Sequence, residues 1–403
     1  MIEADSMHTL TSRASFWVAA AIAAIALWTS AAPTVTYPLY AAEWHLAPSV
    51  TTAIFAVYPI VLVVVLVIFG NISDYIGRRG AMLLGLTASL IGVLLFAIAP
   101  NVVVVLIGRA LMGVGVALSL SPATAAMVEF SAVGKEKRAG AITTAATAVG
   151  LGLATLVGGG LIQYAPFPTH LNFWVLFAVI AVVTTFAWFL PRHTADEARG
   201  AWRPRLPVIP RGIRRFYATS TIAVTTGFAI GAVMMSLGAT IAKDLVGSDN
   251  VLVTGAILSL FAVVVGVVAV VSGGLRPERA IVIGGFATII GMSLLLLSSV
   301  DHSLPVFLAA SAVMGAGYSL LFLGGLSVIS ANAPAHHRAA TLSAVYLVAY
   351  LFQGLIALAL GAVATQTSLQ VALDAGIPTI VVLSIAAILF AAMPRRPRVA
   401  RLA

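Results

Sequence analysis

Long apolar runs, each long enough to cross a membrane as a helix, follow one another through the whole sequence. Of the 403 residues, 61% are hydrophobic and 9% are charged, whereas soluble domains carry about 25% charged residues. Crossing about 30 Å of hydrocarbon takes about 20 helical residues, and a β-barrel strand would be about half as long with alternating polarity. The runs therefore predict transmembrane helices in an integral membrane protein.

We expect twelve such helices in an all-α membrane protein. Their predicted ranges are 14–40, 49–70, 80–99, 102–128, 139–164, 171–190, 215–243, 250–272, 280–299, 304–331, 339–364 and 370–392. The predicted organisation is an N-terminal segment 1–13, a six-helix half 14–190, an Arg- and Pro-rich linker 191–214, a second half 215–392 and a basic tail 393–403.

The two predicted halves repeat each other. The stretch "RALMGVGVAL" from Arg109 recurs as "SAVMGAGYSL" from Ser311, and "KEKRAGA" from Lys135 returns as "HHRAAT" from His336. A fixed offset of this kind indicates an internal repeat. We therefore predict two pseudo-symmetric bundles of six helices.

Lys and Arg are distributed unequally between the two sets of predicted loops. Twenty of the 22 basic residues fall on the side of the termini and the linker, and the exceptions are Arg109 and Lys243. The positive-inside rule then places both termini in the cytoplasm. We expect a multi-pass protein of a bacterial-type inner membrane whose basic loops contact lipid. The basic residues form no patch of the kind that binds nucleic acid.

A charged cluster, "GNISDYIGRRG", separates the second and third apolar runs. Its Gly70, Asp74, Gly77, Arg78 and Arg79 resemble the loop signature G-x-L-x-D-x-x-G-R-R/K of the major facilitator superfamily of secondary transporters, with Ile in the place of Leu. The resemblance covers the whole helical chain. It implies two six-helix bundles that rock about a central site to expose it to each side of the membrane in turn.

Two interpretations of this cluster remain open. Arg78 and Arg79 alone would suffice as a positive-inside anchor, whereas Gly70 and Gly77 are expected to let helices pack closely. Asp74 is suited to accept hydrogen bonds from the N-terminus of a neighbouring helix and to pair with an arginine. We predict a cytoplasmic latch that forms in one transport state only.

Arg109 falls inside the fourth apolar run, where a charge is costly unless it meets a partner or a wet cavity. With Gly113 and Gly115 it resembles a second signature of the superfamily, R-x-x-x-G-x-G. The alternative is that Arg109 extends to the membrane surface. We predict a coupling role for Arg109, with Glu43 and Glu129 as candidate proton carriers.

The fifth apolar run is rich in glycine. Drug and proton antiporters of the superfamily carry G-x-x-x-G-P-x-x-G-G there, and this chain keeps the closing Gly158 and Gly159, and Gly150, but has Ala154 and Thr155 where Gly and Pro belong. The partial match favours export. Simple helix packing through these glycines, as through Gly113 and Gly115, explains them equally well.

Polar and thioether side chains in the first, seventh, tenth and eleventh runs are candidates for the substrate site, which the resemblance places between the halves. The predicted set is Thr34, Tyr37, Tyr40, Met234, Met235, Tyr318, Tyr346, Tyr350 and Gln353. A hydroxyl in such a helix more often bonds its own backbone. This lining suits an amphiphilic or neutral compound better than a sugar.

Several function classes find no support in the sequence. There is no cysteine, no G-x-x-x-x-G-K-[ST] loop and no cluster of metal ligands. We expect no cofactor and no enzymatic activity. The favoured function is proton-coupled efflux of amphiphilic small molecules by a monomeric transporter. The alternatives are metabolite uptake by symport or facilitated diffusion, and a membrane receptor or enzyme that moves no solute.

Overall fold

The computed structural model describes residues 9–70, 72–131, 136–191, 211–246, 250–333 and 338–393. For Asp74, 136–141, Arg211, 244–246 and 338–340 within these ranges, only the backbone is described. The predicted linker 191–214 and tail 393–403 therefore fall almost entirely outside the described residues.

Every regular element in the described ranges is helical. The α-helices are α1 Ser12–Ala31, α2 Tyr37–Glu43, α3 Pro48–Phe69, α4 Ser73–Ala97, α5 Val102–Glu129, α6 Glu136–Tyr164, α7 Leu171–Trp188, α8 Arg214–Ala232, α9 Gly238–Val246, α10 Val251–Val271, α11 Pro277–Asp301, α12 Leu304–Asn332, α13 Arg338–Gln366 and α14 Leu369–Ala392. They supply twelve segments that are long and apolar enough to span a membrane, as predicted. The protein is thus an integral, multi-pass membrane protein.

Two of the twelve spans are interrupted. A 3₁₀ segment, Ala32–Thr36, separates α1 from α2, and a π-helical segment, Val233–Leu237, separates α8 from α9. Pro33 at the start of the first segment lacks the N–H that a continuous α-helix needs there. The predicted runs 14–40 and 215–243 gave no sign of either interruption.

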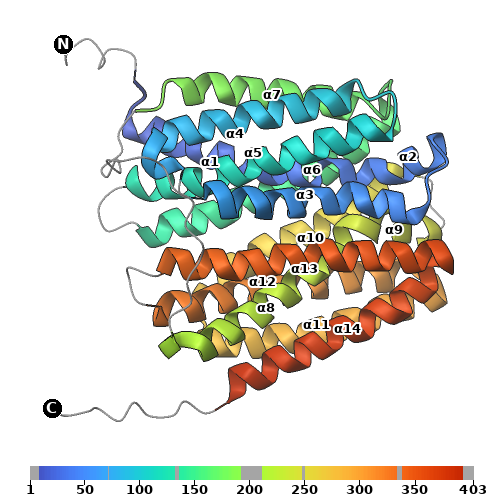
Figure 1. The fold of residues 1–403 in the computed structure, drawn as a ribbon. Coiled ribbons are helices and arrows are strands. Elements are labelled where there is room, and N and C mark those ends of the chain that lie inside the picture. Colours follow the sequence, from blue (N-terminus) through green and yellow to red (C-terminus); the bar gives the residue numbers. More distant parts are fainter. Residues whose placement is uncertain are drawn as a thin grey trace, which may run out of the picture.

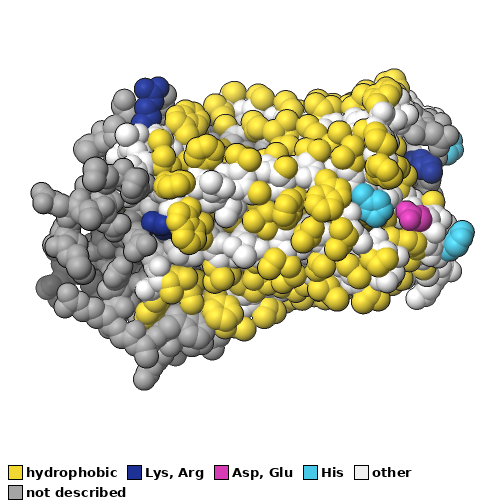
Figure 2. Space-filling model, turned by 90° about the horizontal axis from the view of Figure 1, so that it is seen from above, with side chains coloured by type: hydrophobic (Ala, Val, Ile, Leu, Met, Phe, Trp, Pro, Cys, Tyr) yellow, Lys and Arg dark blue, Asp and Glu magenta, His cyan; other side chains and the backbone are white. Residues whose placement is uncertain are grey.

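The helices form two bundles, α1–α7 and α8–α14, which lie side by side (Figure 1). We call the end where α1 begins and α14 ends the terminal end, and the opposite end the distal end. A wide apolar belt covers the side of the molecule, and charged and His side chains lie near both of its ends (Figure 2). This belt is what a lipid bilayer requires of a transmembrane surface.

The loop predicted for residues 71–79 is mostly helix. α4 begins at Ser73, and Gly77 interrupts it with a φ of 79° and a ψ of 156°. Only glycine adopts such a conformation without steric cost, because it has no Cβ. The charged cluster therefore forms a kinked first turn of α4 rather than a loop.

Close contacts between the bundles run along α6 and α10. Gly255 packs against the Thr155 carbonyl, and a Cβ at Gly159 would lie 2.8 Å from the Val251 carbonyl oxygen. Nearer the terminal end, Gly266 faces Ala148. Small residues allow this approach of two backbones inside a membrane.

Hydrogen bonds join the bundles at the distal end. The Ser49 N–H donates to the Thr365 hydroxyl over 2.7 Å. The Val251 N–H donates to the Gln163 side-chain oxygen over 2.8 Å. Since these residues begin α3 and α10, the distal ends of the two bundles are held together in this structure.

Candidate functional site

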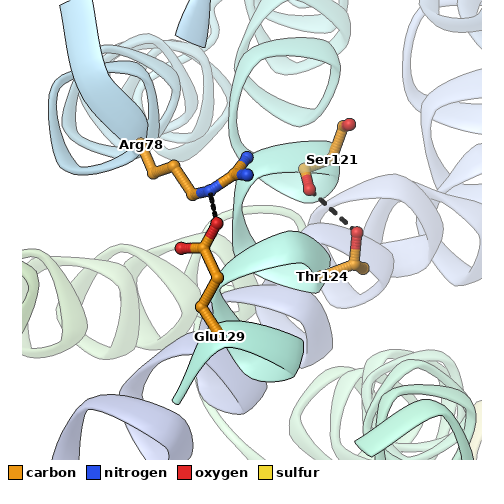
Figure 3. Close-up of polar contacts among 4 residues, drawn as sticks. All are labelled: Arg78, Ser121, Thr124 and Glu129. Atoms are coloured by element: carbon orange, nitrogen blue, oxygen red, sulfur yellow. Dashed lines mark hydrogen bonds and ion pairs between the residues drawn. The ribbon is translucent and has the colours of Figure 1, made fainter. Parts of the chain in front are cut away.

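Two arginines at the terminal end tie α4 to its neighbours. Arg78 Nε donates to Glu129 Oε1 over 2.5 Å, which joins the start of α4 to the end of α5 (Figure 3). Arg79 donates to the Leu190 carbonyl over 3.2 Å and lies over the Trp188 ring at 5.6 Å. Both contacts stay within the first bundle.

The predicted latch is described only in part. The Asp74 side chain lies outside the described residues. A Cβ at Gly70 would collide with the Leu66 carbonyl oxygen one turn earlier. The end of α3 itself therefore requires this glycine. Gly77 is required by its positive φ. The two glycines are explained by local backbone geometry rather than by helix–helix packing.

Arg109 on α5 is the largest fully buried side chain of the described chain. Its Nε donates to the Ile54 carbonyl over 3.2 Å and its Nη1 to the Ser30 carbonyl over 2.8 Å. The Tyr58 ring covers the guanidinium at 4.6 Å, a cation–π arrangement. Arg109 therefore links α5 to α1 and α3 and does not reach the membrane surface.

Two buried hydrogen-bond donors, one of them on this arginine, have no acceptor. Arg109 Nη2 and the Tyr37 hydroxyl are both buried without a hydrogen-bond partner in the described chain. Tyr37 has no exposed surface, and it lies seven residues after Ser30, whose carbonyl accepts from Arg109 Nη1. Buried donors are rarely left unbonded, so such a pair calls for an explanation.

The second bundle repeats this arrangement with a neutral residue. Ser311 on α12 is the repeat counterpart of Arg109, and its hydroxyl donates to the Ile257 carbonyl of α10 over 3.1 Å. Nearby, a Cβ at Gly113 would lie 2.8 Å from the Tyr58 carbonyl oxygen, and one at Gly315 would lie 2.8 Å from that of Phe261. The backbone scaffold is thus the same in both bundles, and the charge is present in only one.

Four aromatic side chains of the second bundle gather around Phe228 on α8. Its ring centroid lies 4.6 Å from that of Tyr350, 5.9 Å from Phe322, 6.3 Å from Tyr318 and 6.4 Å from Tyr346. We call these five residues the aromatic cluster. Pairs at such separations contribute beyond their buried area, so the cluster is a rigid apolar surface.

The polar groups of this cluster are available to a ligand. Tyr318, Tyr346 and Tyr350 are partly exposed, and their hydroxyls make no hydrogen bond to another described residue. Gln353 is also partly exposed, and its side-chain nitrogen lies near Gly231 of α8, beside Tyr318. Three hydroxyls and one amide thus have no hydrogen-bond partner among the described residues.

Tyr58 connects the two groups and was missed in the sequence. Its ring lies on Arg109, and Tyr58 belongs to the continuous core against which Tyr318 and Tyr350 of the second bundle pack. The only available signal was the internal repeat, because Tyr58 and Phe261 occupy equivalent positions opposite Gly113 and Gly315.

The other predicted substrate residues lie apart from this centre. Thr34 Oγ1 contacts Met235 Sδ at 4.0 Å, where the 3₁₀ and π segments meet, and Met234 beside them is fully buried. Tyr40 stacks on Trp44 and donates to the Thr169 carbonyl over 3.3 Å at the distal end. The residues of the predicted set thus make their contacts at three places in the described chain.

The candidate proton carriers lie at the ends of the spans. Glu43 is the last residue of α2 and is exposed, whereas Glu129 forms an ion pair with Arg78.

The predicted packing glycines lie where an added Cβ would meet atoms of a neighbouring helix or segment. Gly115 faces Ser89 and Gly85, Gly150 faces the Ala24 carbonyl, and Gly158 faces Val35 at 3.0 Å.

A sequence profile described as Major Facilitator Superfamily matches residues 16–357. The chain belongs to the major facilitator superfamily. Membership of this superfamily (MFS) indicates a transporter and not an enzyme, and it accounts for the two bundles and their internal repeat.

Individual relatives are more distant. The multidrug efflux pump LfrA of Mycolicibacterium smegmatis is 33% identical over 131 residues, which make up 32% of this chain and 25% of that protein. The match thus spans about a quarter of the length of LfrA.

Solved structures share the fold of this MFS chain at low identity. A variant of the nucleoside transporter NupG superposes with a TM-score of 0.76 at 12% identity, covering 93% of this chain and 99% of that one. A bacterial homologue of the lysosomal transporter Spinster, inward-facing and unoccupied, gives 0.70 at 13%, covering 94% and 96%. A peptide transporter POT gives 0.73 at 16%, covering 94% and 93%.

Proposed function

We propose that this MFS transporter exports amphiphilic small molecules across a bacterial-type inner membrane by proton-coupled alternating access, as a monomer. The observation that carries the proposal is the aromatic cluster, whose three tyrosines are partly exposed and have unbonded hydroxyls. Rings of this kind bind apolar groups, and free hydroxyls orient a polar one.

The direction of transport is supported by two weaker observations. The match to the LfrA efflux pump is short, and the glycine pattern of α6 resembles the antiporter signature only in part. Uptake of a metabolite is the second candidate, and the nucleoside and peptide transporters share only the fold with this chain. Because these structures are under 25% identical, they bear on the fold alone.

The proposed orientation places the terminal end in the cytoplasm. Arg78 and Arg79 lie at this end, and Arg214 begins α8 there. Basic residues are retained on the cytoplasmic side of membranes. In this orientation the distal hydrogen bonds close the outer side, and export requires them to break.

Flux measurements in proteoliposomes test the proposal. The purified chain is reconstituted, a pH gradient is imposed, and the accumulation of a fluorescent amphiphile is followed. A tenfold proton gradient supports about tenfold accumulation per proton. We expect faster accumulation than in empty vesicles and faster decay of the gradient when the amphiphile is present. Identical rates with and without protein, for amphiphiles of either charge, would contradict export.

Asp74 provides a second test of the mechanism. We propose that it forms the cytoplasmic latch in one state. Asp74→Asn should then lower the flux while expression and the melting temperature stay unchanged. Flux equal to wild type would remove Asp74 from the mechanism without affecting the substrate site.

A further inference from the structure

The interior of the described spans has an unbalanced charge. Arg109 is fully buried, and no described carboxylate lies within ion-pair distance of it. The described Asp and Glu side chains are all at least partly exposed, whereas Arg109 is not. A positive charge inside a membrane without a negative partner is unfavourable, so a partner from outside the chain would be strongly attracted.

The fold itself does not require this charge. In the second bundle Ser311 makes the equivalent bond to the Ile257 carbonyl over 3.1 Å, compared with 3.2 Å for Arg109 Nε and Ile54. A neutral hydroxyl thus joins the same two helices. Joining these two helices takes only one hydrogen-bond donor. The charge and the remaining N–H groups of Arg109 are therefore available for another purpose.

The unbonded donors indicate the chemistry of the missing partner. Arg109 Nη2 and the Tyr37 hydroxyl can both donate, and both are buried without an acceptor. A carboxylate or sulfonate supplies several acceptor oxygens and a negative charge, and charge-assisted bonds are the stronger kind. A cationic compound would be repelled by Arg109 and would meet no carboxylate in the described interior.

We propose that the amphiphilic cargo is an organic anion, whose acidic group is bound by Arg109 and Tyr37 and whose apolar part lies on the aromatic cluster. The inference rests on the proposed transport function and specifies its substrate class. Tyr58 connects the two places, because its ring lies over Arg109 and it belongs to the core against which Tyr318 and Tyr350 pack. It is therefore the side chain that must turn away when the anion reaches the guanidinium.

The position of Tyr37 links anion binding to the rocking motion. Tyr37 follows the 3₁₀ segment Ala32–Thr36 directly, and Thr34 in this segment contacts Met235 of the π segment in the other bundle. We expect separation of the bundles at the distal end to break this contact and to free the segment that leads into Tyr37. Binding and release of an anion would then differ between the two states.

An anionic cargo also gains from the membrane potential. An inside-negative potential favours outward movement of one negative charge by about 50-fold per 100 mV. This driving force acts on the cargo itself and needs no acidic side chain in the interior. It adds to the force of an inward proton.

Equilibrium binding to the purified full chain tests the inference. The probes are 2-naphthalenesulfonate, the neutral 2-naphthalenesulfonamide and the cationic 2-naphthyltrimethylammonium, which share one ring system. We expect the sulfonate to bind at least about tenfold more tightly than the cation. Tyr37→Phe keeps the ring and removes one donor, and it should weaken sulfonate binding about tenfold or more and sulfonamide binding by less, because a bond to a charged acceptor is the stronger one. Tyr164→Phe, at an exposed tyrosine of α6, is the matched control.

The possible outcomes of these measurements separate the anion site from the transport function. Tighter binding of the cation, no binding of the sulfonate, or an unchanged sulfonate affinity in Tyr37→Phe would overturn the anion site. Flux of the cation in the proteoliposome assay would preserve export and reject only the anionic cargo. Sulfonate binding without flux of any probe would preserve the site and reject transport. Loss of sulfonate binding in Arg109→Ser supports the anion site only if the melting temperature of the variant stays near that of the wild type.

Discussion

The two bundles of this protein solve the same packing problem with different side chains. Gly113 and Gly315 bring α5 and α12 equally close to the backbones of α3 and α10. Arg109 and Ser311 donate to the equivalent carbonyls of Ile54 and Ile257. Where the bundles agree, the residues serve the fold. Where they differ, as at the charge of Arg109 and the aromatic cluster of the second bundle, function is the better explanation.

Arg109→Ser gives the first bundle the residue that the second one uses. We expect flux of an anionic amphiphile to fall about 10- to 100-fold, because hydrogen bonds to a charged group are lost. Ser311→Ala removes one neutral bond and should leave flux within about fivefold of wild type. Initial rates in proteoliposomes, at matched protein content, measure both. Equal losses in the two variants would show that the bundles do not differ in this function.

Gly113→Ala and Gly315→Ala test the similarity of the two scaffolds. A Cβ at either position would lie 2.8 Å from a carbonyl oxygen of the neighbouring helix. We expect each variant to lose about 1–3 kcal/mol of stability through overpacking, by similar amounts. Gly160→Ala is the control, because its Cβ would meet only the end of Leu252 at 3.9 Å. Thermal unfolding in detergent compares them, and a large loss in one bundle alone would contradict the equivalence.

Gly77→Ala tests a feature found at the start of α4. With a φ of 79°, an alanine there should cost about 1–2 kcal/mol. Gly80→Ala, three residues later, places its Cβ in ordinary contact with Ile76 at 3.5 Å and should be neutral or slightly stabilising. The same unfolding assay reports both, and a neutral Gly77→Ala would mean that α4 does not need the kink.

The ion pair of the first bundle should have the smallest effect. Arg78 and Glu129 are 30% and 40% exposed, and exposed pairs contribute about 0.2–1 kcal/mol. A double-mutant cycle with Arg78→Gln and Glu129→Gln measures their coupling, which should weaken as salt is raised. A coupling above about 2 kcal/mol would make this pair a major structural tie of the terminal end.

The fold could be predicted from the sequence because lipid imposes one strong requirement. Apolar runs of about 20 residues are hard to mistake, and both the twelve spans and the internal repeat are confirmed. The interruptions at Ala32–Thr36 and Val233–Leu237 could not be predicted, because they arise from contacts between bundles. The prediction for the start of α4 was wrong, because the polar residues suggested a loop. The backbone is instead helical from Ser73 and has a single kink at Gly77.

The site was harder to predict, because individual side chains in an apolar helix carry little pattern. Arg109 was evident as a lone charge, and Tyr318, Tyr346 and Tyr350 were found as polar groups in the expected helices. Phe228 was missed because a phenylalanine in an apolar span is unremarkable. Its importance comes from the four rings around it, which belong to helices far apart in the sequence.

We infer that the charge of Arg109 binds the cargo and is not needed for the fold. The most direct measurement is the electrical current that follows a concentration jump of 2-naphthalenesulfonate on a supported membrane of proteoliposomes. We predict a transient current in which negative charge follows the probe into the vesicles. We also predict that Arg109→Ser lowers this current about 10- to 100-fold while its melting temperature stays near wild type. A current with 2-naphthyltrimethylammonium and none with the sulfonate would contradict the account.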